Sequence, residues 1–328
     1  MECTLTIQKE VWPLKEPFRI SRGVKTEAQV VTVKLERSGM VGQGECTPYP
    51  RYDETPASVL QQIEAARPQL ETGLTLDQLQ TLIPAGAARN AVDCALWDLH
   101  AKEKGTSASA LLNLTPPKNL ITAVTIPIGT PLEMGAKAKT LSKCPLLKVK
   151  LGNTDILESV QAIRDNAPNA QIILDPNESW SLGLLKQMDQ ALSDMGVAML
   201  EQPLAASDDE GLLGYDNIVP ICADEACHTA ESLEHLKGRY QIINIKLDKT
   251  GGLTGALALL AEAQKNDFDI MIGCMVATSL AMAPAMLLAP HAKFIDLDGP
   301  VWMRKDRPLG LEIQNGIIKE FPNKLWGG

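Results

Sequence analysis

The stretch "LLKVKLG" (146–152) reads as a buried strand that carries two lysines. Side chains alternate between the two faces of a strand, so Lys148 and Lys150 project from one face and their apolar neighbours from the other. A solvated edge strand is the simplest explanation, because charges at an edge discourage aggregation. The fold around this stretch decides whether the two lysines face solvent or an interior.

Similar apolar runs recur from Ile121 onward, and stretches with helical periodicity, such as 155–167, 184–195 and 256–265, lie between most of them. An alternation of strand and helix every 22 to 27 residues or so is typical of a (β/α)8 barrel. The runs are "ITAVTIPI" (121–128), "LLKVKL" (146–151), "QIILD" (171–175), "VAMLE" (197–201), "VPICAD" (219–224), "IINIKL" (242–247), "DIMIGC" (269–274) and "KFIDLD" (293–298).

The first part of the chain has a different pattern. The stretches "CTLTIQKEVWPL" (3–14) and "AQVVTVKLERSG" (28–39) alternate like antiparallel strands, and helical patterns follow at 57–70 and 89–103. We therefore expect an α+β domain in front of the barrel.

These patterns divide the chain into three parts. We expect an α+β capping domain at 1–115, the barrel with the catalytic site at 116–300, and a C-terminal segment at 301–328 that returns to the capping domain. That last segment contains "LGLEIQNGIIKEF", which predicts a hairpin with an Asn315-Gly316 turn.

The composition of the chain argues against several classes of function. The chain has 328 residues and a net charge of -9, which argues against a nucleic-acid partner. No stretch is long and apolar enough for a membrane span, and the start lacks the pattern of a secretory signal. The seven cysteines form no C-x-x-C pair, which suits reduced thiols and predicts a cytoplasmic protein. A small-molecule ligand is expected.

Three successive runs end in an acid, at Asp175, Glu201 and Asp224. The carboxyl ends of barrel strands meet at one mouth, where the active site lies. Each acid alone could be the N-cap of the following helix. Three carboxylates at one point are costly without a cation, and their hard oxygen donors suit Mg²⁺. The sequence therefore predicts a magnesium site at the mouth of the barrel.

A closed barrel has no edge strands, so Lys148 and Lys150 are expected to face its interior. Two further lysines compete in "IINIKLDKTGG" (242–252). The alternation of the strand points Asn244 and Lys246 inward, whereas Lys249 has the opposite parity and is expected in the following loop. We therefore choose Lys246, which the ring of strands places opposite Lys150.

Two lysines that face one carbon beside a metal-bound carboxylate describe a 1,1-proton transfer. Lysine acts as a base near neutral pH only if its pKa is lowered, which we expect from burial, Lys148 and the metal. The same cations would stabilise the charge that develops when a proton leaves the carbon next to a carboxylate.

The set of motifs "LKVKL", "LDPNESW", "MLEQPL", "ADEACHT" and "NIKLDKTGGLTGAL" resembles the muconate-lactonising subgroup of the enolase superfamily, and within it the bacterial dipeptide epimerases of the L-Ala-D/L-Glu type. The resemblance also covers "GECTPYPRY" and "PAGAARNAVDCALWDL" in the first domain. It implies an N-terminal capping domain and a modified TIM barrel, (β/α)7β. It assigns Asp175, Glu201 and Asp224 to one Mg²⁺, Lys150 and Lys246 to acid/base catalysis, and Lys148 to the substrate carboxylate.

The resemblance also indicates where substrate choice lies. Asp296 and Asp298 share one face of "IDLDGP" (295–300), and the matching D-x-D of dipeptide epimerases binds the free ammonium of the substrate. The alternative is an acid pair that caps the exit of the chain from the barrel. Thr125 and Cys274 fall where relatives contact the dipeptide, and Arg22 falls near the glutamate side chain. Packing or solvation would also explain these three residues, and the loop 49–52 is expected to cover the site.

The expected function is Mg²⁺-dependent epimerisation of the C-terminal residue of a dipeptide, from L-Ala-D-Glu to L-Ala-L-Glu, in the recycling of cell-wall peptides. The alternatives are an N-acylamino acid racemase or another enzyme of the subgroup, a Schiff-base aldolase, and a barrel that only binds peptides. The range of dipeptides, the division of labour between the lysines and a possible homo-oligomer stay open.

Overall fold

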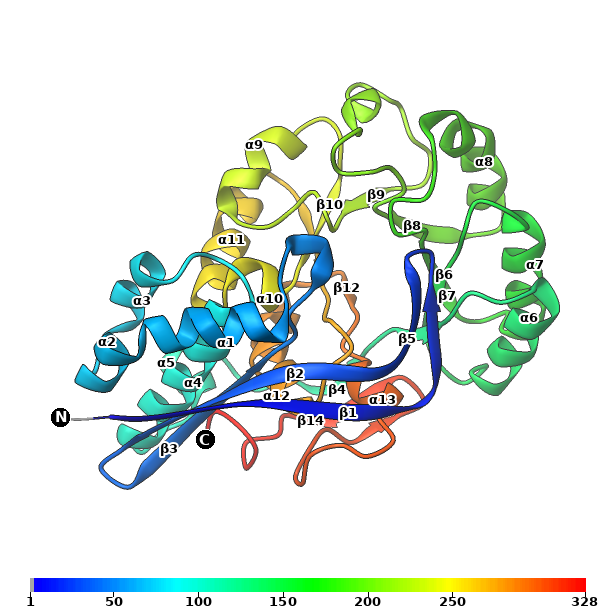
Figure 1. Cartoon of the computed structure of the whole chain (residues 1–328). Helices are drawn as coiled ribbons and strands as arrows, with labels where there is room; N and C mark the ends of the chain where they lie inside the picture. Colours follow the sequence, from blue (N-terminus) through cyan, green and yellow to red (C-terminus); the bar gives the residue numbers. More distant parts are fainter. Residues whose placement is uncertain (1–2) are drawn as a thin grey trace.

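A curled sheet of eight parallel strands forms the centre of the molecule (Figure 1). The computed structural model describes residues 3–328, so Met1 and Glu2 of the expected capping domain lie outside the described residues. Neighbouring strands follow the order of the chain, and Ala123 N donates to Ile295 O at 2.7 Å between the two ends of the sheet. The strands are β5 (Val124–Ile126), β6 (Leu146–Lys150), β7 (Gln171–Asp175), β8 (Val197–Glu201), β9 (Ile221–Ala223), β10 (Ile242–Ile245), β11 (Asp269–Ile272) and β12 (Phe294–Ile295).

The two faces of the sheet separate two apolar clusters. Inside the curl, one residue from each strand region forms a buried layer that includes Leu146 and Ile173. Outside it, Leu147 and Val149 belong to the large core shared with the surrounding helices. The alternation predicted for 146–152 is therefore present, and the lysines share the inner face with Leu146.

Helices cover the outside of the sheet, as Figure 1 shows for α6 (Pro131–Thr140), α7 (Ile156–Asn166), α8 (Leu182–Asp194) and α11 (Leu253–Lys265). The connection between β8 and β9 contains only a short 3₁₀ turn, Glu210–Leu212, in place of an α-helix. The other connecting helices are α9 (Leu233–Leu236), α10 (Leu247–Thr250) and α12 (Ser279–Ala285), and α13 (Gly299–Trp302) follows the last strand. The predicted modified TIM barrel is confirmed.

The N-terminal part is the predicted α+β unit. Strands β1 (Thr4–Ile20), β2 (Gly23–Arg37) and β3 (Met40–Cys46) form an antiparallel sheet. A Cβ on Gly42 or Gly44 would lie 2.2 Å from a carbonyl oxygen of the helix that covers the sheet, so only glycine permits this close packing. The helices are α1 (Pro56–Ala65), α2 (Arg67–Thr72), α3 (Leu76–Leu82), α4 (Ala87–Glu103) and α5 (Ala108–Leu111).

The run expected as the first barrel strand, 121–128, is divided in the structure. Its first residue, Ile121, ends β4 (Lys118–Ile121), which pairs with the C-terminal hairpin of β13 (Ile313–Gln314) and β14 (Ile317–Glu320), and only Val124–Ile126 joins the barrel. Asn315 and Gly316 form the hairpin turn with positive φ. Beyond it, Gly327 N donates to Asp98 Oδ1 of α4 at 2.7 Å, so the end of the chain contacts the N-terminal helices.

Within residues 3–328, no helix combines the length and the apolar character that crossing a membrane requires.

Candidate active site

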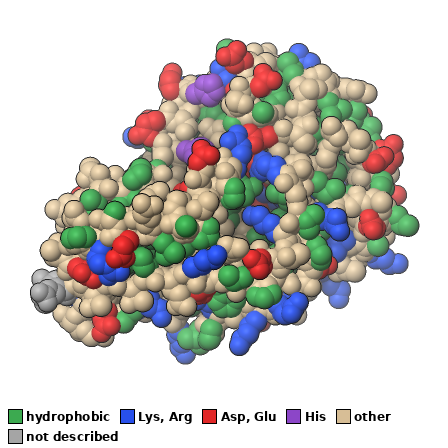
Figure 2. Space-filling view, in the orientation of Figure 1, with side chains coloured by type: hydrophobic (Ala, Val, Ile, Leu, Met, Phe, Trp, Pro, Cys, Tyr) green, Lys and Arg blue, Asp and Glu red, His purple; other side chains and the backbone are tan. Residues whose placement is uncertain are grey.

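The carboxyl ends of the barrel strands bring the predicted residues to one mouth. On β6 the inner face reads Leu146, Lys148 and Lys150 from the closed end of the barrel outward, and all three side chains are buried. Other strands repeat this order, with an apolar residue below an acid, as in Ile173 and Asp175. Figure 2 shows basic and acidic side chains side by side around a hollow at the centre of this face.

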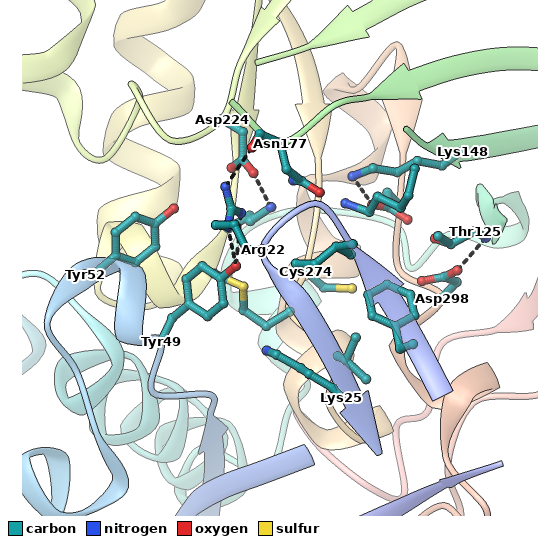
Figure 3. Close-up of a pocket in the computed structure, with 17 residues that line it drawn as sticks. Arg22, Lys25, Tyr49, Tyr52, Thr125, Lys148, Asn177, Asp224, Cys274 and Asp298 are labelled. Carbon is teal, nitrogen blue, oxygen red and sulfur yellow. Dashed lines mark hydrogen bonds and ion pairs between the residues drawn. The ribbon is translucent and has the colours of Figure 1, made fainter. Parts of the chain in front are cut away.

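A pocket at the mouth contains most of the predicted site. Asp175 and Glu201 do not line it, because they lie fully buried beneath it. Figure 3 shows Lys148, Asp224, Thr125 and Asp298 around this space. The predicted residues that line the pocket are Arg22, Thr125, Lys148, Lys150, Asp224, Lys246, Cys274, Asp296 and Asp298, and others are Phe18, Lys25, Tyr49, Tyr52 and Asn177.

Lys148 lies at the centre of a cluster of carboxylates. Its Nζ lies 2.6 Å from Glu201 Oε2, 2.8 Å from Asp296 Oδ2 and 3.1 Å from Asp175 Oδ2. Burial would lower the pKa of Lys148, but these three carboxylates outweigh burial and raise the pKa well above its ordinary value. Lys148 therefore carries a fixed positive charge next to the pocket.

We expect Lys148→Met to destabilise the protein by about 3–5 kcal/mol, because three buried carboxylates would lose the cation that contacts all of them. Urea unfolding of the metal-free protein at neutral pH measures this loss. Lys293→Met is the matched control, since that lysine pairs with Asp269 at a surface position where both side chains are 51% exposed. Equal small effects of both substitutions would show that Lys148 is not needed to hold the carboxylates together.

The two predicted acid/base lysines approach the pocket from β6 and from the end of β10. Lys150 Nζ donates to Asp175 Oδ2, and Lys246 Nζ lies 2.5 Å from Asp224 Oδ2 and 3.9 Å from Glu201 Oε1. Burial would lower the pKa of Lys246, but Asp224 and Glu201 outweigh it and raise the pKa. The expected lowering depends on the bound metal as well as on Lys148, so it stays a prediction for the metal-loaded site.

Buried oxygens of the site offer the ligand chemistry of a hard cation. Asn177 Oδ1, Glu201 Oε2, Asn244 Oδ1 and Asp296 Oδ1 are buried and accept no hydrogen bond within residues 3–328, although Glu201 Oε2 lies near Lys148 Nζ. In that same part of the chain, no three His, Cys, Asp or Glu side chains form a ready-made metal site, and lysine ammonium groups lie between the carboxylates. The donor set of three carboxylates fits Mg²⁺.

The acid pair after β12 lies on the other side of Lys148. Asp296 contacts that lysine, and Asp298 Oδ2 accepts from Thr125 N at 2.8 Å and from Trp302 Nε1 at 3.2 Å. Burial and the neighbouring Asp296 raise the pKa of Asp298 to about 6. Of these two buried acids only Asp296 contacts Lys148, so the pair can accept a second positive charge. Burial and the same acids raise the pKa of the nearby Cys274, so its thiol is uncharged.

The tip of the β1–β2 hairpin lies next to β6 and β7 in Figure 1, and its residues Ile20 and Arg22 line the pocket. Arg22 holds this tip to the barrel loops, because its Nη2 lies 2.6 Å from Glu225 Oε1 and its Nη1 lies 3.2 Å from Glu178 Oε2. Arg22 also donates to the hydroxyl of Tyr49, at 3.0 Å from Nη2. The guanidinium that we expected near the substrate side chain is thus already paired with two carboxylates.

Lys25 on the same hairpin was not singled out in the sequence. It lines the pocket and lies 4.9 Å from the centre of the Tyr49 ring, and within residues 3–328 it has no carboxylate partner. Burial, Arg22, Lys150 and Lys246 lower the pKa of Lys25 to about 8. No motif marked this residue, because only the fold of the hairpin brings it over the barrel.

Lys249 lies in a short helix and not in a loop after the strand, so that expectation is wrong. It lies on α10 with its side chain fully buried, and its Nζ donates to Asp224 Oδ1 at 2.6 Å. Its neighbour Asp248 accepts from Thr47 N at 3.0 Å and from Asn90 Nδ2 at 2.8 Å, and so connects the end of β10 to the N-terminal domain. Strand alternation ends before α10, and one helical turn brings Lys249 back beside Lys246.

Two family models together match most of the chain. The "Mandelate racemase / muconate lactonizing enzyme, N-terminal domain" model covers residues 2–113, and the "Enolase C-terminal domain-like" model covers residues 133–321. The chain belongs to this enzyme family. Its two halves correspond to the α+β unit and to the barrel described above.

Two curated relatives cover almost the whole chain. The chain is 52% identical over 317 residues to the L-Ala-D/L-Glu epimerase of Escherichia coli (strain K12), with 96% of this chain and 99% of the relative covered. It is 44% identical over 301 residues to the N-acetyl-D-glutamate racemase of Pseudoalteromonas sp, with 91% of this chain and 95% of the relative covered. The chain is therefore an isomerase of the family.

Solved structures of this fold superimpose closely. An enolase family member from Agrobacterium tumefaciens with homology to dipeptide epimerases, with bound sodium and L-Ala-L-Glu, has a TM-score of 0.96 and 44% identity, with 99% of this chain and 100% of that chain covered. The dipeptide epimerase from Enterococcus faecalis V583, complexed with Mg and L-Leu-L-Tyr, has a TM-score of 0.91 and 28% identity, with 98% and 99% covered.

Proposed function

We propose that the protein epimerises the C-terminal residue of a dipeptide, with L-Ala-D-Glu and L-Ala-L-Glu as the preferred pair and Mg²⁺ as the cofactor. The observation that carries this proposal is the pocket itself: Lys150 and Lys246 reach it from two distant strands, and the acid pair of Asp296 and Asp298 borders the same space. The relatives named above support the choice of L-Ala-Glu.

Each group in the pocket has a proposed task. Asp175, Glu201 and Asp224 would hold Mg²⁺, which supplies positive charge beside the carboxylate of the substrate. Lys150 or Lys246 takes the proton from the α-carbon, and the other lysine returns a proton to the opposite face. Lys148 adds a fixed positive charge that favours the anionic form of the substrate between these two events.

The substrate ammonium is proposed to bind at Asp296 and Asp298. Asp296 Oδ1 is buried and accepts no hydrogen bond within residues 3–328, so it can receive an N–H donor. A free amine is what a dipeptide has and an N-acylamino acid lacks. This acid pair therefore favours a dipeptide over the alternative of an N-acylamino acid racemase, to which the Pseudoalteromonas relative would otherwise point.

Acetylation of the substrate amine tests this choice. We expect kcat/KM for N-acetyl-L-Ala-D-Glu to be at least about 10²-fold below that for L-Ala-D-Glu, because the acid pair would lose its charged partner. In Asp298→Asn, the difference in kcat/KM between the free and the acetylated dipeptide should become smaller. Turnover of the acetylated compound at the rate of the free dipeptide would instead favour an N-acylamino acid racemase.

Lys25 is the group best placed to select an acidic side chain, because Arg22 is already paired with Glu178 and Glu225. The pKa of Lys25 is about 8, so Lys25 is charged below that pH and neutral above it. We expect kcat/KM for L-Ala-D-Glu to fall about tenfold as the pH rises through 8, relative to a dipeptide with a neutral side chain. In Lys25→Gln this difference between the substrates should lose its pH dependence, and an unchanged profile would exclude Lys25 from side-chain binding.

The proposed setting is the recycling of cell-wall peptides in the cytoplasm. All seven cysteines of residues 3–328 are free thiols, as is common in a reducing compartment.

A further inference from the structure

Lys249 is the most deeply buried lysine of the site, and its side chain is fully covered. Its Nζ lies within hydrogen-bond distance of three oxygens: Asp224 Oδ1 at 2.6 Å, the main-chain oxygen of Asp224 at 2.5 Å and the main-chain oxygen of Asn244 at 3.0 Å. An ammonium group has three N–H donors, so all of them are used. Lys249 does not line the pocket, and this separates it from Lys246.

The contacts to Asp224 hold one residue at two points. Because the same ammonium binds the side chain and the main chain of Asp224, rotation of that carboxylate would break a charged hydrogen bond. The other carboxylate oxygen, Oδ2, lies 2.5 Å from Lys246 Nζ. Each oxygen of Asp224 is thus assigned to a different lysine, and only Oδ2 faces the lysine that borders the pocket.

The third contact extends this arrangement to a second acid. Lys249 fixes the main chain of Asn244, and Asn244 Nδ2 donates to Glu201 Oε1 at 2.8 Å. Glu201 and Asp224 are the two carboxylates nearest Lys246 Nζ. One buried lysine therefore contacts Asp224 directly and is connected to Glu201 through Asn244.

We propose that Lys249 is a positioning residue for the metal site: it holds Asp224 through Oδ1, and thereby keeps Oδ2 and Glu201 in place for the cation and for Lys246. This inference rests on the proposed function only in its choice of cation. A buried ammonium is destabilising unless it is fully paired, so an apolar side chain would fill this position more favourably if packing were the only requirement.

The test is a calorimetric titration of the metal-free full-length protein with Mg²⁺ alone, for wild type and Lys249→Met. We expect the dissociation constant to rise about tenfold or more in the variant, in the range found when residues that orient metal ligands are replaced. The control is Lys237→Met, because this lysine is 46% exposed and pairs with Glu234 on the surface. An unchanged dissociation constant in folded Lys249→Met would overturn the proposal.

A substitute variant and a second measurement complete the test. If Lys249→Met does not fold, Lys249→Arg replaces it, because a planar guanidinium keeps the charge but cannot reach the same three oxygens. Weaker Mg²⁺ binding by Lys249→Arg would support the proposal, and Mg²⁺ binding as in wild type would contradict it. The second readout is α-hydrogen exchange from each dipeptide diastereomer. A positioning role slows the exchange that depends on Lys246 more than the exchange that depends on Lys150, whereas a purely structural defect slows both equally and counts against it.

The magnesium titration needs no substrate. If wild type binds Mg²⁺ but turns over no dipeptide, the proposed function fails and the comparison between wild type and Lys249→Met still stands. If wild type binds no Mg²⁺, the role proposed for Lys249 fails as well.

Discussion

Replacing Lys150 or Lys246 by alanine is expected to reduce epimerisation of L-Ala-D-Glu by at least about 10³-fold, because one face of the α-carbon would lose its proton donor or acceptor. The remaining lysine still reaches the pocket, so each variant should exchange the α-hydrogen of one diastereomer and not of the other. Chiral separation of the products and mass spectrometry of the α-deuterium measure both effects.

Lys150→Ala and Lys246→Ala should each retain α-hydrogen exchange with a different diastereomer. Lys265→Ala is a suitable control, since its side chain on α11 is 70% exposed. Loss of exchange from the same diastereomer in both variants would contradict bases on two faces, and epimerisation at wild-type rate in either variant would remove that lysine from the mechanism.

The second large effect is expected from Glu201→Gln. This side chain is fully buried, lies near Lys148 and accepts from Asn244, and the amide has nearly the same shape but no charge. We expect Mg²⁺ binding and turnover to be lost together, with turnover down by at least about 10³-fold. Calorimetry and the epimerisation assay measure the two losses independently.

Two further measurements check this interpretation. Treatment with EDTA should abolish turnover in wild type, and added Mg²⁺ should restore it. Glu234→Gln, with a side chain that is 83% exposed, should change neither binding nor turnover. Full activity after removal of divalent cations would contradict the cofactor assignment, and borohydride trapping of a substrate would then favour the aldolase alternative.

Much of the fold could be predicted from the sequence, because the barrel depends on repeated local patterns. The alternation in 146–152 placed Lys148 and Lys150 on the inner face, and the structure has them there. The boundary of the first strand was less accurate. Ile121 pairs with Ile317 of the C-terminal hairpin, and such pairing between distant segments leaves no local signal.

The sequence predicted the orientation of site residues correctly where they lie on strands, because side chains there alternate regularly between the two faces. The strand rule placed Lys246 inward, but it failed three residues later, because α10 begins at Leu247 and brings Lys249 onto Asp224. Lys25 could be recognised as a pocket residue only from the three-dimensional path of the hairpin. The direction of the Lys246 pKa shift depends on competing neighbours at distances that no sequence pattern provides.

The central claim is that this pocket moves a proton on and off the α-carbon of a dipeptide. The most direct measurement is incubation of L-Ala-D-Glu and, in a separate reaction, L-Ala-L-Glu with the Mg²⁺-loaded protein in D₂O, followed by mass spectrometry and chiral analysis. We predict that each dipeptide acquires one deuterium at the α-carbon of glutamate as the two diastereomers interconvert. Interconversion without deuterium, or no exchange with these or any other free dipeptides, would contradict the claim.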